Sequence, residues 1–145
     1  ARTTRSPPTH GDPVAHAGAP PDFPAFVRRP THATRVMCTA WHGDEQRNIP
    51  ACTQCHGSAM TGLLPAYPGL LGLPRDYLVG QLGAWQTGKR HAATPDCMGQ
   101  IAKRLTVDEV STIATWLSSQ PLPAQTHAVA AGTTPQPVPC GSGPQ

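Results

Sequence analysis

The sequence contains little of what several functional classes require. No stretch approaches the roughly 20 consecutive apolar residues of a membrane-spanning helix, so we expect no transmembrane segment in this chain. The net charge is +3 over 145 residues and the basic residues are scattered, which gives no argument for nucleic-acid binding. Aromatic residues make up 5% and charged residues 13% of the chain, so a small core would gain from burying a large apolar group.

Proline and glycine are abundant, with 18 and 14 residues, and their distribution divides the chain into three parts. Residues 1–36 are rich in proline and show neither a helical nor an alternating apolar pattern, which predicts an extended N-terminal arm. Residues 37–120 contain the periodic apolar patterns and predict a single domain. Residues 121–145 return to proline, threonine, alanine and glycine, and predict an extended C-terminal tail.

The most informative motif is Cys52-Thr53-Gln54-Cys55-His56. Two thiols at this spacing can form thioethers with the vinyl groups of a haem, and the adjacent histidine can ligate its iron. A thioredoxin-like redox pair needs a βαβ context, which is absent, and a zinc site needs a second ligand pair at comparable spacing. Neither alternative explains the adjacent histidine. We therefore predict one haem attached at Cys52 and Cys55, with His56 as the proximal ligand.

Apolar spacing predicts a helical domain with no strand of appreciable length. A helix is predicted between Pro74 and Gly88, because larger side chains recur there every three or four residues: Tyr77, Leu78, Gln81, Leu82 and Trp85. A Thr-x-x-Glu capping box at 106–109 opens a second helix, which ends before Pro121. Weaker helices are predicted from about residue 44 toward the haem motif and over residues 99–105.

A six-coordinate haem iron needs a second axial ligand on the face opposite His56, and a thioether in that position raises the reduction potential. Met98 is the leading candidate, because it lies between two predicted helices in a segment that can return across the haem. Met60 follows His56 too closely to reach the opposite face, and Met37 precedes the attachment site. Two histidines remain alternative ligands that would lower the potential: His42 and His91.

Taken together, these residues resemble a class I c-type cytochrome, and most of all one haem domain of the dihaem cytochrome c-four type and its monohaem relatives. The similarity covers about residues 43–120 and leaves both tails unexplained. It rests on the haem motif with its flanks, on a Pro-Gly-Leu-Leu-Gly segment, and on positions in the predicted helices: 43–44, 49–57, 68–72, 77–78, 81–82, 85, 88, 90, 98, 101–102, 105–106 and 116–117. The chain departs from the dihaem proteins in having one haem motif instead of two.

The resemblance implies an all-α fold of three or four helices around one covalent haem c, with proline-rich arms at both ends. It also implies that the backbone carbonyl of Pro68 accepts a hydrogen bond from the His56 imidazole, and that Met98 is the sixth ligand. Three further residues would contact the haem, the last two near a propionate: Tyr77, Trp85 and Arg90. Ordinary core burial explains Tyr77 and Trp85 equally well.

Three cysteines remain after haem attachment. Cys97 adjoins Met98 and Cys140 lies in the terminal tail, so we hypothesise a Cys97–Cys140 disulfide that holds the tail over the methionine loop. Cys38 stays open, as a buried thiol, a free thiol or a bridge to another chain. Covalent haem and five cysteines both favour an oxidising compartment, so we expect a periplasmic or otherwise extracytoplasmic protein whose signal peptide has been removed.

These features predict one-electron transfer without bond chemistry, carried out by a relay subunit or partner of a larger oxidoreductase or respiratory complex. The expected partners are a protein donor and a protein acceptor, such as a dehydrogenase or a terminal oxidase. The alternative is a haem enzyme or ligand-binding haem protein with an open sixth position. The sequence shows no convincing distal acid–base set for it, since Arg90 and His91 serve solvent or a propionate equally well.

Overall fold

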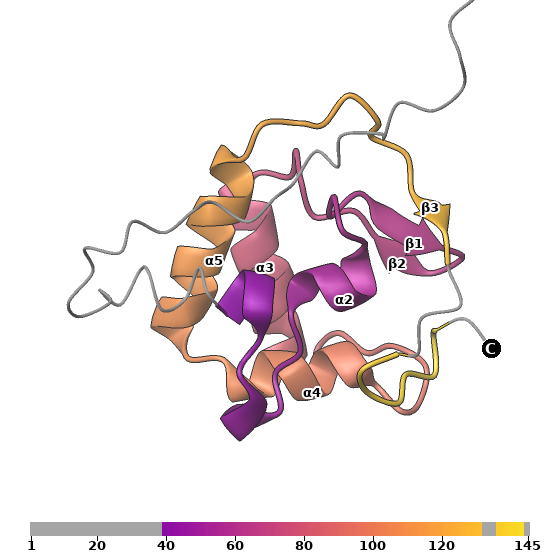
Figure 1. Cartoon of the computed structure of the whole chain (residues 1–145). Coiled ribbons are helices and arrows are strands. Elements are labelled where there is room, and N and C mark those ends of the chain that lie inside the picture. Colours follow the sequence, from indigo (N-terminus) through magenta and orange to yellow (C-terminus); the bar gives the residue numbers. More distant parts are fainter. Residues whose placement is uncertain (1–38, 132–135, 144–145) are drawn as a thin grey trace, which may run out of the picture.

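The computed structural model describes residues 39–131 and 136–143 of the chain. In these residues, helices pack around an apolar centre and a small sheet lies to one side (Figure 1). A helical turn at 39–42 is followed by η1 (Glu45–Arg47), α2 (Cys52–His56), β1 (Gly62–Leu64), β2 (Tyr67–Pro68), α3 (Arg75–Gln86), α4 (Cys97–Arg104), α5 (Val107–Ser119) and β3 (Val129–Ala130). The mostly helical fold expected from the sequence is confirmed.

Helix α3 forms where the apolar spacing predicts it. The sequence suggested that Pro74 lies in the first turn of this helix. In the structure Pro74 is the N-cap residue, one position before the helix begins. The buried side chains Leu78 and Leu82 are one turn apart, and they face the core between α4 and α5. The chain leaves the helix through Gly88, whose φ of 72° lies in the left-handed region that glycine adopts without strain.

Helix α5 begins at the predicted capping box. The Thr106 hydroxyl accepts a hydrogen bond from the Glu109 amide at 3.2 Å, and the Glu109 carboxylate accepts one from the Thr106 amide at 2.8 Å. Four apolar side chains on one face of the helix are buried: Val110, Ile113, Ala114 and Leu117. This face packs against α3, so the two longest helices form one wall of the core.

The two weaker helix predictions are only partly correct. The expected 99–105 helix is α4, which begins two residues earlier because the Asp96 carboxylate accepts a hydrogen bond from the Gly99 amide at 2.8 Å. The weak helix expected from about residue 44 toward the haem motif, with an interruption at Pro50, does not form as one element. A short 3-10 turn forms instead and ends at Asn48 with a left-handed φ of 52°, and α2 starts afresh after Pro50.

The sheet was not expected from the sequence. Strand β1 pairs antiparallel with β2 and parallel with β3, with Leu63 opposite both Tyr67 and Val129. Strands of two or three residues are too short to show an alternating pattern. Through β3, part of the segment that we predicted as a C-terminal tail lies beside the domain. The N-terminal arm, Met37 and Cys38 lie outside the described residues.

Candidate haem site

An apolar cavity of about 370 Å³ lies between α2, α3, α4 and the C-terminal segment. Its volume is in the range of pockets that hold organic ligands. Helix α2 contributes the haem motif, α3 contributes Tyr77 and Trp85, and α4 contributes Met98. The deep wall is formed by apolar core residues of α3 and α5, including Leu82 and Ile113. The cavity therefore collects the predicted cofactor residues from three helices.

Both motif cysteines line this cavity, because a spacing of three residues places them on one face of α2. Neither is joined in a disulfide in the described part of the chain. Burial raises the pKa of the Cys52 thiol to about 11, with a smaller contribution from Cys55, and burial also raises the pKa of Cys55. A thioredoxin-like pair needs a lowered thiol pKa, so this environment does not suit it.

The His56 imidazole is buried and oriented by the backbone. Its Nδ1 lies 2.7 Å from the carbonyl oxygen of Pro68 on β2, which is the contact expected from the sequence. Because a carbonyl can only accept, Nδ1 carries the hydrogen and Nε2 keeps the lone pair that binds a metal. Burial lowers the pKa of His56, although the bond to Pro68 acts in the opposite direction. A neutral imidazole is the form that ligates iron.

Some of the candidates for the second axial ligand line the cavity and others do not. Met98 lies in the first turn of α4, is half-buried and lines the cavity. His91 lines the cavity too, but its side chain is exposed, whereas His42 is exposed and is not part of the lining. Met60 is 2% exposed and packs in the hydrophobic core, away from the cavity lining. The cavity thus brings Met98 and His91, but not His42 or Met60, to the same space as His56.

Trp85 and Arg90 bring a polar donor and a positive charge to the cavity lining. The guanidinium carbon of Arg90 lies 4.1 Å from the centroid of the Trp85 ring, and both residues line the cavity. The Trp85 Nε1 is buried and has no hydrogen-bond partner among the described residues. A buried donor normally has a partner, so an unpaired indole beside a cation suits an acidic group such as a haem propionate. Tyr77 is 49% exposed at the rim, which rules out core burial as its role.

Sequence reasoning missed two parts of the cavity. Tyr67 is buried on the lining and stands immediately before Pro68, so its position beside the histidine-binding carbonyl was the only available signal. Cys140 and Ser142 line the cavity from the C-terminal segment. The Cys97–Cys140 disulfide hypothesised from the sequence is present. The position of Ser142 on the cavity lining could not be predicted from the sequence, because it depends on where the disulfide places this segment.

These residues fit a covalently attached haem. The two thiols are unbonded and share a wall with an oriented neutral imidazole, and a thioether lines the same apolar space. An unpaired buried donor is available for an acidic edge of the group. Among the described residues, no three or more His, Cys, Asp or Glu side chains gather as a metal site, which leaves the zinc alternative without its second ligand pair. The site and fold define a haem-attaching protein of the small helical cytochrome type.

Comparison with known proteins agrees with this class. No family model matches the sequence. The chain is 35% identical over 72 residues to cytochrome c-554(548) of Halomonas halodenitrificans, covering 50% of this chain and 87% of that protein. It is 37% identical over 99 residues to the thiosulfate dehydrogenase electron acceptor of Stutzerimonas stutzeri, covering 68% of this chain and 46% of the relative. This chain therefore spans less than half of that second relative.

Solved structures give the same result. The chain matches 49% of the cytochrome c4 of Acidithiobacillus ferrooxidans with a TM-score of 0.53, 36% identity and 61% of this chain covered. It also matches 22% of a thiosulfate dehydrogenase (TsdBA) chain from Marichromatium purpuratum with a TM-score of 0.58, 37% identity and 77% of this chain covered. The chain belongs to the class I c-type cytochromes, which carry electrons on covalently bound haem c.

Proposed function

We propose that this chain relays single electrons between two protein partners through one haem, attached at Cys52 and Cys55 with His56 and Met98 as axial ligands. The observation that carries the proposal is that an imidazole oriented by Pro68 and the Met98 thioether line one apolar cavity. When bound, the haem supplies reversible one-electron chemistry at iron. The protein supplies the attachment, the ligands and the exclusion of water.

The surrounding residues adjust that chemistry. Pro68 fixes the tautomer of His56 and makes the imidazole a stronger ligand. The Met98 thioether and the apolar wall favour the reduced, less charged iron and raise the potential. Trp85 and Arg90 provide a hydrogen bond and a positive charge to a propionate, and Tyr77 lies at the exposed rim.

We further propose that the electron donor is a dehydrogenase that oxidises thiosulfate or a related sulfur compound. The support is the 37% identity, over 99 residues, to a protein named as the electron acceptor of thiosulfate dehydrogenase. A terminal oxidase or another respiratory protein takes the electron onward. In this proposal residues 37–120 form the haem domain, residues 1–36 and 121–145 are its arms, and the protein works in the periplasm. No helix in the described residues combines the length and apolarity needed to cross a membrane.

The ligation is tested with purified holoprotein and two variants. Pyridine haemochrome analysis with intact mass should show one covalent haem, which is lost in Cys52→Ser/Cys55→Ser. The ferric spectrum should contain the weak sulfur-to-iron band, which Met98→Ala should remove. His91→Ala is the matched control, because His91 lines the same cavity, and it should keep the band. A band that is absent from the wild type, or that persists in Met98→Ala, would contradict the proposed ligand.

The partner is tested by stopped-flow mixing of ferric protein with purified thiosulfate dehydrogenase and thiosulfate. We expect reduction of the haem at a rate that saturates with enzyme concentration and requires both thiosulfate and enzyme. Horse-heart cytochrome c serves as a non-cognate acceptor and should be reduced more slowly. Equal rates for the two acceptors, or no reduction of this protein, would remove the donor assignment and leave the electron-carrier function untouched.

A further inference from the structure

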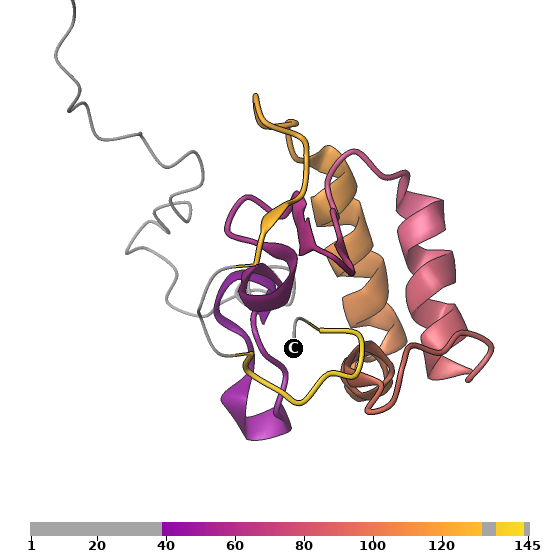
Figure 2. The same ribbon diagram turned by 90° about the vertical axis from the view of Figure 1, so that its right-hand side faces the viewer.

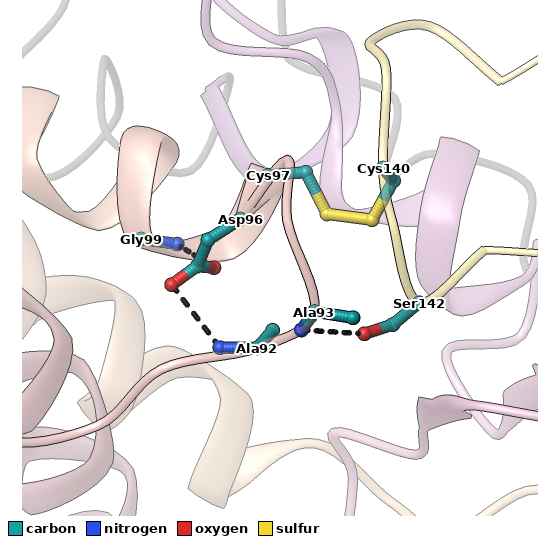
Figure 3. The surroundings of a disulfide bond; sticks show 7 residues. All are labelled: Ala92, Ala93, Asp96, Cys97, Gly99, Cys140 and Ser142. Carbon is teal, nitrogen blue, oxygen red and sulfur yellow. Dashed lines mark hydrogen bonds between the residues drawn. A yellow bond between two sulfur atoms is a disulfide. The ribbon is translucent and has the colours of Figure 1, made fainter.

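The C-terminal segment 136–143 lies across one side of the cavity, between the α2 side of the molecule and α4 (Figure 2). Three links join it to the chain just before and at the start of α4, and Figure 3 shows the disulfide and the hydrogen bond between Ala93 and Ser142. The three links are the Cys97–Cys140 disulfide, a hydrogen bond of 2.9 Å from the Gly141 amide to the Pro95 carbonyl, and one of 3.2 Å from the Ala93 amide to the Ser142 hydroxyl. We call residues 136–143 the strap.

The strap also reaches the opposite wall. A Cβ atom placed on Gly143 would lie 2.6 Å from the Tyr67 hydroxyl oxygen, so the backbone runs close against the residue that precedes Pro68. At Gly141, a Cβ atom would collide with the backbone of Thr94. At Gly141 the neighbouring atoms belong to the backbone, so only glycine allows this approach there. The strap therefore connects the wall that holds His56 with the wall that holds Met98.

The disulfide acts at the residue next to the proposed iron ligand. Cys97 is buried in the first turn of α4 and is followed directly by Met98. On the other side, the Asp96 carboxylate accepts hydrogen bonds from the Gly99 amide at 2.8 Å and from the Ala92 amide at 3.2 Å (Figure 3). The start of α4 is thus fixed by the hydrogen bonds of the Asp96 carboxylate and by the disulfide to the strap.

We propose that the Cys97–Cys140 disulfide is a positioning link, which keeps Met98 on the haem iron and closes that side of the cavity to small external ligands. The proposal rests on the proposed function, because it takes Met98 as the sixth ligand. A thioether is readily displaced from ferric iron, so the time that Met98 spends away from it limits the binding of any competitor. If the link reduces that open fraction, the apparent affinity for a competitor falls by the same factor.

The test measures imidazole binding to the ferric holoprotein by optical titration. In Cys97→Ser/Cys140→Ser, the apparent affinity for imidazole should rise about tenfold, because the open fraction rises by that factor. The sulfur-to-iron band should weaken in parallel, and the reduction potential should fall. Ser142→Ala is the matched control, since it removes one strap hydrogen bond and keeps the disulfide. Its affinity should change less than about threefold, and a change equal to that of the double variant would overturn the role of the disulfide.

A second route does not depend on how the double variant folds. Wild-type holoprotein is first treated with a capping reagent and is then reduced with a phosphine and capped again. The haem is reoxidised with ferricyanide, and peptide mass spectrometry confirms that the second treatment adds groups at Cys97 and Cys140. The same rise in imidazole affinity is expected. A sulfur-to-iron band and an imidazole affinity that both stay unchanged after cleavage overturn the positioning role and leave the His56/Met98 ligation in place. A wild-type protein without the band overturns the ligation itself, and the positioning role with it.

Discussion

For Trp85 the sequence predicts the position on a helix, whereas the surroundings of its indole nitrogen are known only from the structure. Its position on α3 follows from helical spacing, but the burial of Nε1 without a partner among the described residues depends on the packing of the whole cavity. An unsatisfied buried donor costs about 1–3 kcal/mol, which a propionate oxygen would recover. The stacked Arg90 adds a positive charge at the same point. An acidic edge of a bound haem would therefore meet both a hydrogen-bond donor and a positive charge at this point.

Replacing Trp85 by phenylalanine keeps a ring and removes the donor. A hydrogen bond to a propionate disperses negative charge that would otherwise stabilise ferric iron. A hydrogen bond to a charged group is worth ~1.5–3 kcal/mol and only part of it differs between oxidation states, so we expect the potential to fall by about 30 mV. Spectroelectrochemical titration measures it. Trp116→Phe is the control, because Trp116 pairs with Trp41 and does not line the cavity. A potential unchanged in Trp85→Phe would remove the propionate contact.

At the same scale, sequence reasoning placed the residues whose roles follow from short spacing. The Cys-x-x-Cys-His motif, its contact with Pro68 and the pairing of Cys97 with Cys140 were all available from the sequence or from the resemblance. Tyr67 and Ser142 were not, because each reaches the cavity through strand pairing or through the disulfide. Motif residues and cysteine pairs leave a signal in the sequence, whereas contacts made through strand pairing or through the path of the chain beside the disulfide do not.

Among the elements, the two long helices were predictable and the segment before α2 was not. The apolar period and the capping box specify α3 and α5 through neighbours along the chain. The break between η1 and α2 depends on Asn48 adopting a left-handed conformation, and on an isolated bridge between Asp44 and Ile49. Strands β1 and β2 pair locally but are too short to show a pattern, and β3 forms by pairing with β1, which is more than sixty residues away. Patterns within a window cannot report such a partner.

The cap of α5 gives a prediction about stability. Thr106→Ala removes the hydroxyl that accepts the Glu109 amide hydrogen bond, so the free energy of unfolding should fall by about 1 kcal/mol. Urea denaturation of the holoprotein, followed by far-ultraviolet circular dichroism, measures this change. Ser118→Ala on the exposed end of the same helix should shift the free energy by less than about 0.5 kcal/mol. Equal changes in the free energy of unfolding for the two substitutions would show that the capping hydroxyl does not stabilise the fold.

At the scale of the whole molecule, one ionic network ties the segment before the haem motif to α5. The Arg47 guanidinium donates to both oxygens of Glu109, at 2.8 and 3.0 Å, and to Asp44 at 2.7 Å. The Arg104 guanidinium donates to the carbonyl of Asn48 at 2.9 Å. Glu109 also accepts the Thr106 amide hydrogen bond of the capping box. The same carboxylate therefore caps α5 and links this helix to the segment before the haem motif. The ion pair with Arg47 lowers the pKa of Glu109, against the effect of its burial.

This lowered pKa predicts how stability depends on pH. A carboxyl whose pKa is lower in the folded state contributes stability that is fully present above its unfolded value, near 4.5, and is lost as the pH falls through the folded value. The urea midpoint of the holoprotein should therefore stay constant from pH 7 to about 5.5 and decrease below about 4.5. In the holoprotein the His56 imidazole is a proposed iron ligand, so it is not counted among the groups that take up a proton in this range.

Glu109→Gln isolates the charge, because glutamine can still accept the Thr106 amide hydrogen bond of the capping box. At pH 7 this variant should lose about 1 kcal/mol, since the pair is only partly buried, with Arg47 35% and Glu109 11% exposed. As the pH falls below about 4.5 the wild-type carboxyl also takes up a proton, so the difference between the two proteins should shrink. Arg75→Gln, which removes an exposed pair with Asp76, should leave the wild-type pH profile intact. If Glu109→Gln kept the full acid dependence of the wild type, carboxylates outside this network would have to control acid unfolding.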